Sequence, residues 1–331
     1  MMKSFDEKLT RILAEPNCRE FIIADAKDGD MGLGIAAPGF NPDHDAFPFR
    51  RLEEYRQNMR DIVSQGLVDI MLMSPSSCEQ LAINEGIFND STVTPAARAN
   101  DTTDVWLGLT GAYQHTPSIP FRSSTIDHIL TGNESGEGPR TGADLGLYSI
   151  TFNNDPHLDA RSVECYQEFR LEAERKGFRH FLEVFAPNAP VNPVEDVGRF
   201  VNDCIARTLA GISQATRPLF LKMPYFGPEA MSQLLHYDPS LVPGILGGAS
   251  GTTHDAFRML WEAKKYGARA ALFGRKINNS EHQLTFVRFL RELADDNIEP
   301  EEAVKAYHGE LEKLGIAPHR ALEDDLALTQ V

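Results

Sequence analysis

Short apolar runs alternate with longer helix-like segments along most of this chain. Most of the runs are apolar at consecutive positions, as expected for strands of a parallel sheet with both faces covered. Two of the intervening segments end in Lys-Gly or Tyr-Gly, where glycine suits the C-terminus of a helix. The expected strands are 21–26, 68–73, 104–110, 144–152, 179–185, 218–225, 242–250 and 268–274.

Eight strands that alternate with helices predict the α/β class and a (β/α)8 TIM barrel. An open doubly wound sheet is the alternative, but it needs a glycine-rich dinucleotide loop, and residues 25–39 contain no clean GxGxxG. We expect one domain over residues 1–331, with an N-terminal helix and the barrel over about 20–295. A C-terminal helix and tail should follow over 299–331.

Residues 111–141 form a long segment rich in Ser, Thr, Pro and Gly between two expected strands. The simpler interpretation is an elaborated surface loop. The functional interpretation is a loop that partly covers the mouth of the barrel.

Composition narrows the class of protein. The chain has 48 acidic and 32 basic side chains, which gives a formal net charge of −16. This charge disfavours nucleic acid and anionic membranes as partners, because both reward basic patches. The sequence also lacks an apolar run of membrane-spanning length and a signal-peptide core. With four scattered cysteines and no CxxC pair, we expect a cytoplasmic protein with reduced thiols.

Lys222 interrupts an otherwise apolar strand, LFLKMPY (219–225). Alternate residues of a strand face opposite sides. Leu219, Leu221 and Met223 form an apolar face that suits packing against helices. Lys222 on the opposite face should then point into the barrel, near the strand end where barrel active sites lie. The same rule turns Asp25 and Glu183 inward on two other strands. Three ionisable side chains are therefore expected to converge on the barrel mouth.

A desolvated lysine suits Schiff-base chemistry, because its free amine can attack a carbonyl. A carboxylate or phenol must then move protons. Asp25 and Glu183 are the candidates, with Tyr148 as a third whose facing stays open. The alternative for Lys222 is a structural ion pair with one of these carboxylates. Asp28, just beyond the first strand, either caps a loop or contacts a substrate hydroxyl.

The last third of the chain carries a glycine-rich anion signal. The stretch GGASGTT (247–253) lies between an expected strand and a helix, so its backbone can approach an anion closely. The next strand ends in FGRK (273–276), which adds an arginine. Loops after strands seven and eight often bind phosphate in TIM barrels. The alternative for this stretch is a glycine-rich turn in which a threonine caps the following helix. The expected phosphate-binding residues are Gly247, Gly248, Ser250, Gly251, Gly274 and Arg275.

The ten histidines form no HxH or HExxH motif, so neither a metal nor another cofactor is expected.

Several stretches together resemble the class I (Schiff-base) aldolases of the DeoC/LacD and archaeal-type fructose-bisphosphate aldolase group. They are FIIADAKDGD, FLEVF, PLFLKMPY, ILGGASGTTHDAF and GARAALFGRKI. The resemblance covers about residues 20–315 and is strongest over the last third. It implies that Lys222 forms the Schiff base, that Asp25 is the acid at the end of strand one, and that Glu183 is the strand-five carboxylate.

The stretch LGLYSITF (145–152) departs from this family, since it has neither the second lysine of the tagatose-type branch nor the Tyr-Pro-Gly of the archaeal type. The proton shuttle and the sugar therefore stay open. The expected function is that of a metal-independent class I aldolase, a lyase that cleaves or forms a C–C bond of a small phosphorylated ketose through a lysine Schiff base. The resemblance to barrel aldolases also suggests a homo-oligomer. The alternatives are a non-covalent isomerase or decarboxylase and a non-catalytic sugar-phosphate-binding protein.

Overall fold

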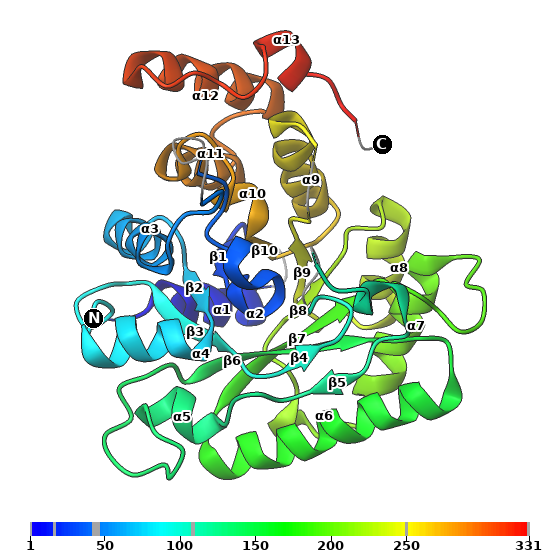
Figure 1. Cartoon of the computed structure of the whole chain (residues 1–331). Coiled ribbons are helices and arrows are strands. Elements are labelled where there is room, and N and C mark those ends of the chain that lie inside the picture. Colours follow the sequence, from blue (N-terminus) through cyan, green and yellow to red (C-terminus); the bar gives the residue numbers. More distant parts are fainter. Residues whose placement is uncertain (1, 16–17, 42–46, 107–109, 249–250, 330–331) are drawn as a thin grey trace.

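The computed structural model describes residues 2–15, 18–41, 47–106, 110–248 and 251–329. Within these ranges, eight parallel strands close into a barrel in the order β1-β10-β9-β8-β7-β6-β3-β2 (Figure 1). The strands are β1 (Ile22–Lys27), β2 (Ile70–Met73), β3 (Thr94–Arg98), β6 (Leu145–Thr151), β7 (Arg179–Phe185), β8 (Leu221–Met223), β9 (Pro243–Leu246) and β10 (Ala270–Phe273). The TIM barrel expected from the sequence is confirmed.

The third barrel strand lies earlier in the chain than expected. Residues 103–106 form a turn instead of a strand, and residues 107–109 lie outside the described part of the chain. The true third strand, β3, reads TPAAR, and it pairs with β2 and β6. Alanine and proline are poor strand formers, so this segment carries no strand signal of its own. Its neighbours in the barrel hold it extended.

Helices alternate with the strands and surround the barrel, and α12 and α13 lie at the outer edge of the molecule beside α9 and α11 (Figure 1). The α-helices are α1 (Ser4–Ala14), α2 (Asp30–Leu33), α3 (Leu52–Gln65), α4 (Pro75–Cys78), α5 (Ile126–Thr131), α6 (Pro156–Lys176), α7 (Val197–Leu209), α8 (Pro228–Tyr237), α9 (Thr253–Lys265), α10 (Arg275–Asn278), α11 (Gln283–Ala294), α12 (Pro300–Leu314) and α13 (Leu322–Asp325). Four short turns of other helical types are η1 (Gly34–Ala36), η2 (Glu79–Asn84), η3 (Tyr113–His115) and η4 (Gln214–Thr216), and β4 (Asp101–Thr102) pairs with β5 (Pro120–Phe121).

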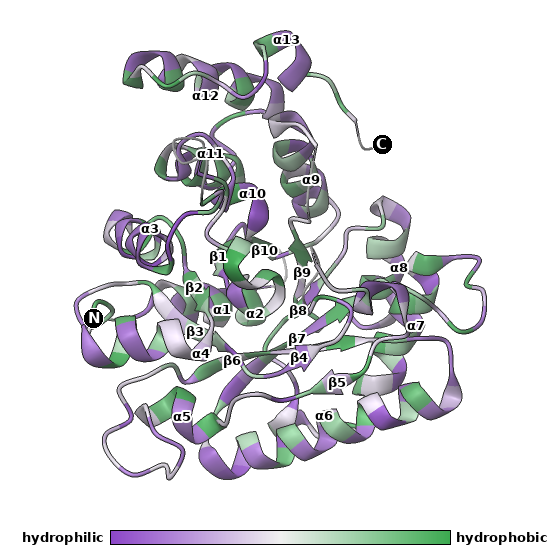
Figure 2. Cartoon of the chain, in the orientation of Figure 1, coloured by the Kyte–Doolittle hydropathy of each residue, from purple (hydrophilic) through white to green (hydrophobic). Residues whose placement is uncertain are grey.

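The peripheral helices α6 and α12 mix hydrophilic and hydrophobic residues along their lengths (Figure 2). This mixture suits helices that pack one side against the barrel and leave the other in water. Among the described residues, none of the helices combines the length and the hydropathy needed to cross a lipid bilayer.

The barrel wall separates two apolar layers. Inside, side chains from alternate strand positions pack together with three residues of α1, which covers the amino-terminal end of the barrel. This inner layer includes Phe5, Leu9, Ile12, Ile22, Ala24, Leu72, Leu145, Leu147, Phe181, Phe220 and Leu272. Outside, the other strand positions pack against the helices, among them Ile23, Met71, Leu182, Val184, Met223 and Ala271. Both faces of the strands are therefore apolar over most of their length.

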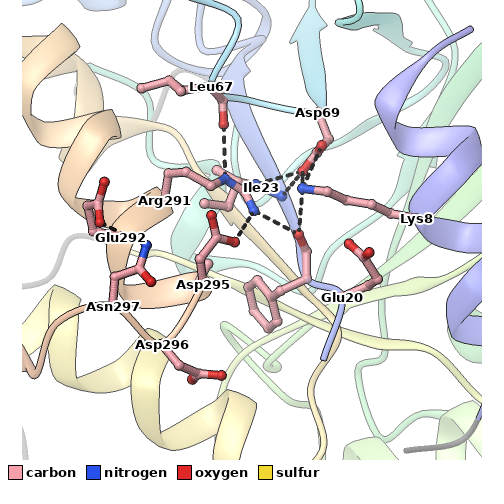
Figure 3. A network of polar contacts seen from close by, with 12 residues as sticks. Lys8, Glu20, Ile23, Leu67, Asp69, Arg291, Glu292, Asp295, Asp296 and Asn297 are labelled. Carbon is pink, nitrogen blue, oxygen red and sulfur yellow. Dashed lines mark hydrogen bonds and ion pairs between the residues drawn. The ribbon is translucent and has the colours of Figure 1, made fainter. Parts of the chain in front are cut away.

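A buried polar network joins elements at the amino-terminal end of the barrel (Figure 3). Asp69 lies 3.0 Å from Lys8 Nζ and accepts hydrogen bonds from the Ile23 N–H at 2.8 Å and from Arg291 Nη2 at 2.8 Å. Arg291 also donates to the carbonyl oxygen of Leu67 at 3.3 Å. The network thereby ties α1, β1 and the approach to β2 to α11.

Candidate active site

Lys222 and Glu183 lie side by side inside the barrel. They occupy paired positions on β8 and β7, and their Nζ and Oε1 atoms are 2.6 Å apart. The two residues are only 6% and 1% exposed. Both face the interior, as the alternation of apolar residues predicted, because Phe220 and Phe181 two positions earlier belong to the inner layer.

Arg98 extends this pair into a chain of alternating charges. Its Nη1 donates to Asp28 Oδ2 at 2.7 Å, and its Nη2 donates to Ser149 Oγ at 3.2 Å. Ser149 in turn donates to Glu183 Oε2 at 2.7 Å. Two carboxylates, one guanidinium and one ammonium therefore balance within a single buried cluster. We refer to Asp28, Arg98, Glu183 and Lys222 as the charge cluster.

The charge cluster keeps Asp28 ionised. Burial acts to raise the pKa of this carboxyl, but the charges of Arg98 and then Lys222 outweigh it and hold the pKa below its ordinary value. Burial likewise acts to lower the pKa of Arg98, but Asp28 and Glu183 outweigh it and raise that pKa. Asp28 is therefore a carboxylate at neutral pH, able to accept a hydrogen bond from a substrate hydroxyl.

Asp25 faces away from the barrel interior, which corrects the sequence prediction. Ile22 and Ala24 belong to the inner layer, so Asp25 points outward toward the helices. Its Oδ2 lies 3.3 Å from Lys27 Nζ, which donates to Gln283 Oε1 at the start of α11 at 2.8 Å. The prediction assumed that apolar residues mark the outer face. In a barrel filled with apolar side chains, both faces are apolar, and the alternation alone cannot distinguish them.

Tyr148, whose facing the sequence left open, also lies outside the barrel. Its ring packs against Tyr166 and Phe169 of α6, with centroid distances of 4.9 and 4.7 Å. Burial raises the pKa of its phenol above the ordinary value. The candidate proton shuttles Asp25 and Tyr148 are therefore both separated from Lys222 by the barrel wall.

A cavity of about 420 Å³ opens at the carboxyl-terminal end of the barrel and joins the charge cluster to the glycine-rich loops. Gly247, Gly248, Gly274 and Arg275 line it together with all four members of the cluster. A Cβ on Gly247 would come within 2.2 Å of the Phe273 ring. The backbone at Gly247 can therefore lie this close to Phe273 only because glycine has no side chain.

Two predicted phosphate residues, Ser250 and Gly251, are not among the described residues that line this cavity. Ser250 lies outside the described residues. Gly251 lines a neighbouring cavity instead of the one that contains Lys222.

The loop after β3 also reaches the cavity. Asp104 and Gln114 line it, and Asp104 accepts hydrogen bonds from Thr151 Oγ1 at 2.7 Å and Ser118 Oγ at 2.8 Å. These contacts favour the interpretation in which the segment 111–141 partly covers the barrel mouth. Within the ranges that the structure describes, no group of three or more His, Cys, Asp or Glu side chains could hold a metal ion.

Sequence reasoning missed Arg98 and Ser149. Arg98 ends β3, the strand that the sequence placed too late, so its position at the barrel mouth could not be inferred. Ser149 lies inside the predicted strand 144–152, but a single serine gave no signal beside the prominent Tyr148.

Comparison with solved structures gives extensive matches. An archaeal fructose-1,6-bisphosphate aldolase, with its catalytic lysine covalently bound to the carbinolamine intermediate, matches with a TM-score of 0.63 and 17% identity, over 87% of this chain and 98% of that chain. A Schiff-base-forming fructose-1,6-bisphosphate aldolase matches with a TM-score of 0.62 and 18% identity, over 87% and 98%. A protein from Corynebacterium glutamicum matches with a TM-score of 0.59 and 16% identity, over 90% and 99%.

The resemblance to Schiff-base aldolases is thus confirmed at the level of the fold, which is what identities this low establish. A scan against protein-family models gives no match, and a search of curated protein sequences gives none.

Proposed function

We propose that the protein is a class I aldolase that forms or cleaves a C–C bond of a phosphorylated ketose through a Schiff base at Lys222. The observation that carries this proposal is the buried Lys222–Glu183 contact of 2.6 Å in a cavity that the glycine-rich loops also line. An amine, a proton carrier and an anion site in one cavity are what such a reaction requires. The fold shared with Schiff-base aldolases supports the same class.

Glu183 is the proton carrier for Schiff-base formation. It takes a proton from the Lys222 ammonium, and the free amine then attacks the ketose carbonyl. A proton moves from nitrogen to oxygen to give the carbinolamine. Glu183 returns its proton to the carbinolamine hydroxyl, which leaves as water, and the iminium forms. The carboxylate is restored at the end of the step, so the balance of protons is kept.

Asp28 takes the role that the sequence assigned to Asp25. In the cleavage direction, a base must remove a proton from the hydroxyl on the second carbon away from the iminium carbon. The C–C electrons then flow into the iminium and leave an enamine on Lys222. Asp28 lines the cavity and is ionised, and Arg98 holds its carboxylate at 2.7 Å. Asp25 and Tyr148 take no part.

The phosphate of the ketose binds where the glycine-rich loops line the cavity. Gly247, Gly248 and Gly274 expose backbone there, and Arg275 adds a cation. Among the described residues, Arg275 has no acidic partner and remains available to a ligand.

Borohydride trapping with dihydroxyacetone phosphate tests the proposal. We expect a reduced adduct that peptide mass mapping places on Lys222, and we expect its loss in Lys222→Met, which removes the amine at similar side-chain volume. The matched control is the double variant Asp25→Asn/Lys27→Met, which removes a buried lysine outside the cavity and should keep the adduct. If the phosphosugar binds to the wild-type protein without forming an adduct, the covalent mechanism is wrong and the non-covalent alternatives take its place.

A further inference from the structure

A second cavity of about 410 Å³ adjoins the candidate active site and shares Arg275 and Asn279 with it. His319 and Arg320 of the C-terminal extension line one part of this cavity. Lys276 also lines it and adds a third basic side chain beside Arg275 and Arg320. Gly247, Gly248 and Gly274, which we propose bind the substrate phosphate, do not line this cavity, so the second cavity shares only Arg275 with the proposed substrate phosphate site.

The second cavity brings three basic side chains together on its wall. Within the described part of the chain, Arg275, Lys276 and Arg320 form no ion pair. Lys276 Nζ makes a single long hydrogen bond, to the carbonyl oxygen of Gly251 at 3.3 Å. An ammonium carries three donors and a guanidinium five, so most of the donors here have no protein acceptor. Such a group is unusual in a chain whose formal net charge is −16.

The acidic side chains nearby are already engaged by other donors. Glu281, which lines the cavity, accepts from Tyr307 Oη at 2.9 Å and from the backbone N–H of His319 at 2.8 Å. Asp325 accepts from the backbone N–H of Thr253 at 2.7 Å and lies 3.0 Å from His308 Nε2. These carboxylates hold the C-terminal extension in place and act on Lys276 without a direct contact, while all three cations line the cavity.

The pKa of Lys276 lies below its ordinary value, chiefly because the side chain is buried. The charges of Asp325, Glu281 and Asp255 act to raise it, and the neighbouring charge of Arg320 acts to lower it. A bound anion would reverse this balance, because an opposite charge stabilises the ammonium form.

We propose that the second cavity is an effector site for a small polyanion that carries a phosphate or pyrophosphate group, distinct from the substrate. Arg275, Lys276 and Arg320 supply the charge-assisted hydrogen bonds. Arg275 also lines the active-site cavity, so the polyanion and the substrate phosphate both act on one guanidinium. Occupancy of the second cavity therefore alters how firmly Arg275 holds the substrate.

Calorimetric titration with inorganic pyrophosphate, in metal-free buffer, tests the site. We expect two binding sites per wild-type chain, one in each cavity. Arg320→Gln should weaken one of them about tenfold and leave the other unchanged, because it removes one charged contact of the second cavity. Arg320 is exposed and lies outside the proposed catalytic residues, so this variant should fold normally and keep the trapped adduct on Lys222.

Two matched variants control for the change in net charge. Arg320→Lys should keep most of the affinity. Arg207→Gln, which removes an exposed arginine on α7, should keep all of it. A single pyrophosphate site, or two sites that Arg320→Gln leaves unchanged, overturns the proposal whether or not Lys222 forms an adduct. Two sites without any adduct would instead count against the aldolase assignment alone.

Discussion

Two members of the charge cluster, Asp28 and Arg98, have pKa values that their neighbours shift in favour of the charged form. Asp28 stays ionised because Arg98 and Lys222 lie beside it, and Arg98 in turn contacts Glu183 at 3.8 Å. Removing one partner from a buried ion pair leaves an uncompensated charge and is strongly destabilising. Variants of this cluster should therefore be judged by chemical readouts, such as adduct formation, together with a measurement of folding.

Asp25 carries a pH dependence of its own. Burial raises the pKa of Asp25 to about 6, against an ordinary value of 3.8, while the charge of Lys27 acts to lower it. The folded state thus binds this proton at higher pH than the unfolded chain, so the free energy of unfolding rises as the pH falls from about 7 to about 4.

Urea unfolding of the wild type and of Asp25→Asn/Lys27→Met at both ends of this range tests the prediction. The wild type should gain up to about 3 kcal/mol relative to the variant on acidification. If the free energy of unfolding changes with pH equally in the wild type and the variant, the raised pKa of Asp25 is wrong.

At the scale of elements, the ends of β9 and β10 set the shape of the phosphate loops. A Cβ on Gly274 would lie 2.6 Å from the carbonyl oxygen of Ala26 on β1, so an alanine there must push two barrel strands apart. We expect Gly274→Ala to lower the free energy of unfolding by about 1–3 kcal/mol and to weaken dihydroxyacetone phosphate binding.

Gly309 offers the matched control for this substitution, since it lies within α12 and a Cβ there meets nothing within 4 Å. Gly309→Ala should raise the free energy of unfolding by about 0.5–1 kcal/mol and leave binding unchanged. Equal binding by both variants would contradict the role of close backbone approach at Gly274.

The sequence predicted those elements whose signals were local. Lys222 and Glu183 could be placed because a single charge within an apolar strand has few explanations. The side of the barrel wall that Asp25 faces could not be predicted. Apolar residues such as Ile22 and Ala24 suit the barrel interior as well as the helix-facing side. Arg98 could not be placed, because β3 is extended through its pairing with β2 and β6 and not through the propensities of its residues. Burial and strand pairing depend on the closed barrel, so local sequence signals do not reveal them.

For the whole molecule, the network around Asp69 is a buried polar tie at the amino-terminal end of the barrel (Figure 3). Asp69→Asn would leave Lys8 and Arg291 close together without their shared anion. We expect a loss of about 3–5 kcal/mol in the free energy of unfolding, measured from the denaturant midpoint. Glu53→Gln breaks an exposed pair with Arg60 and should cost no more than about 1 kcal/mol. Similar losses from both variants would contradict this view of the network.

The same network has a consequence for how the protein is made. Lys8 and Arg291 lie near opposite ends of the chain, and β1 pairs with β10 to close the barrel. Neither contact can form until the ribosome has synthesised β10 and then residue 291, and such distant contacts form slowly. A chain that stalls before β10 leaves one edge of β1 open, and a chain that stalls before residue 291 lacks the Arg291 side of this network. Incomplete chains should therefore aggregate or be degraded and should not accumulate as stable half-barrels.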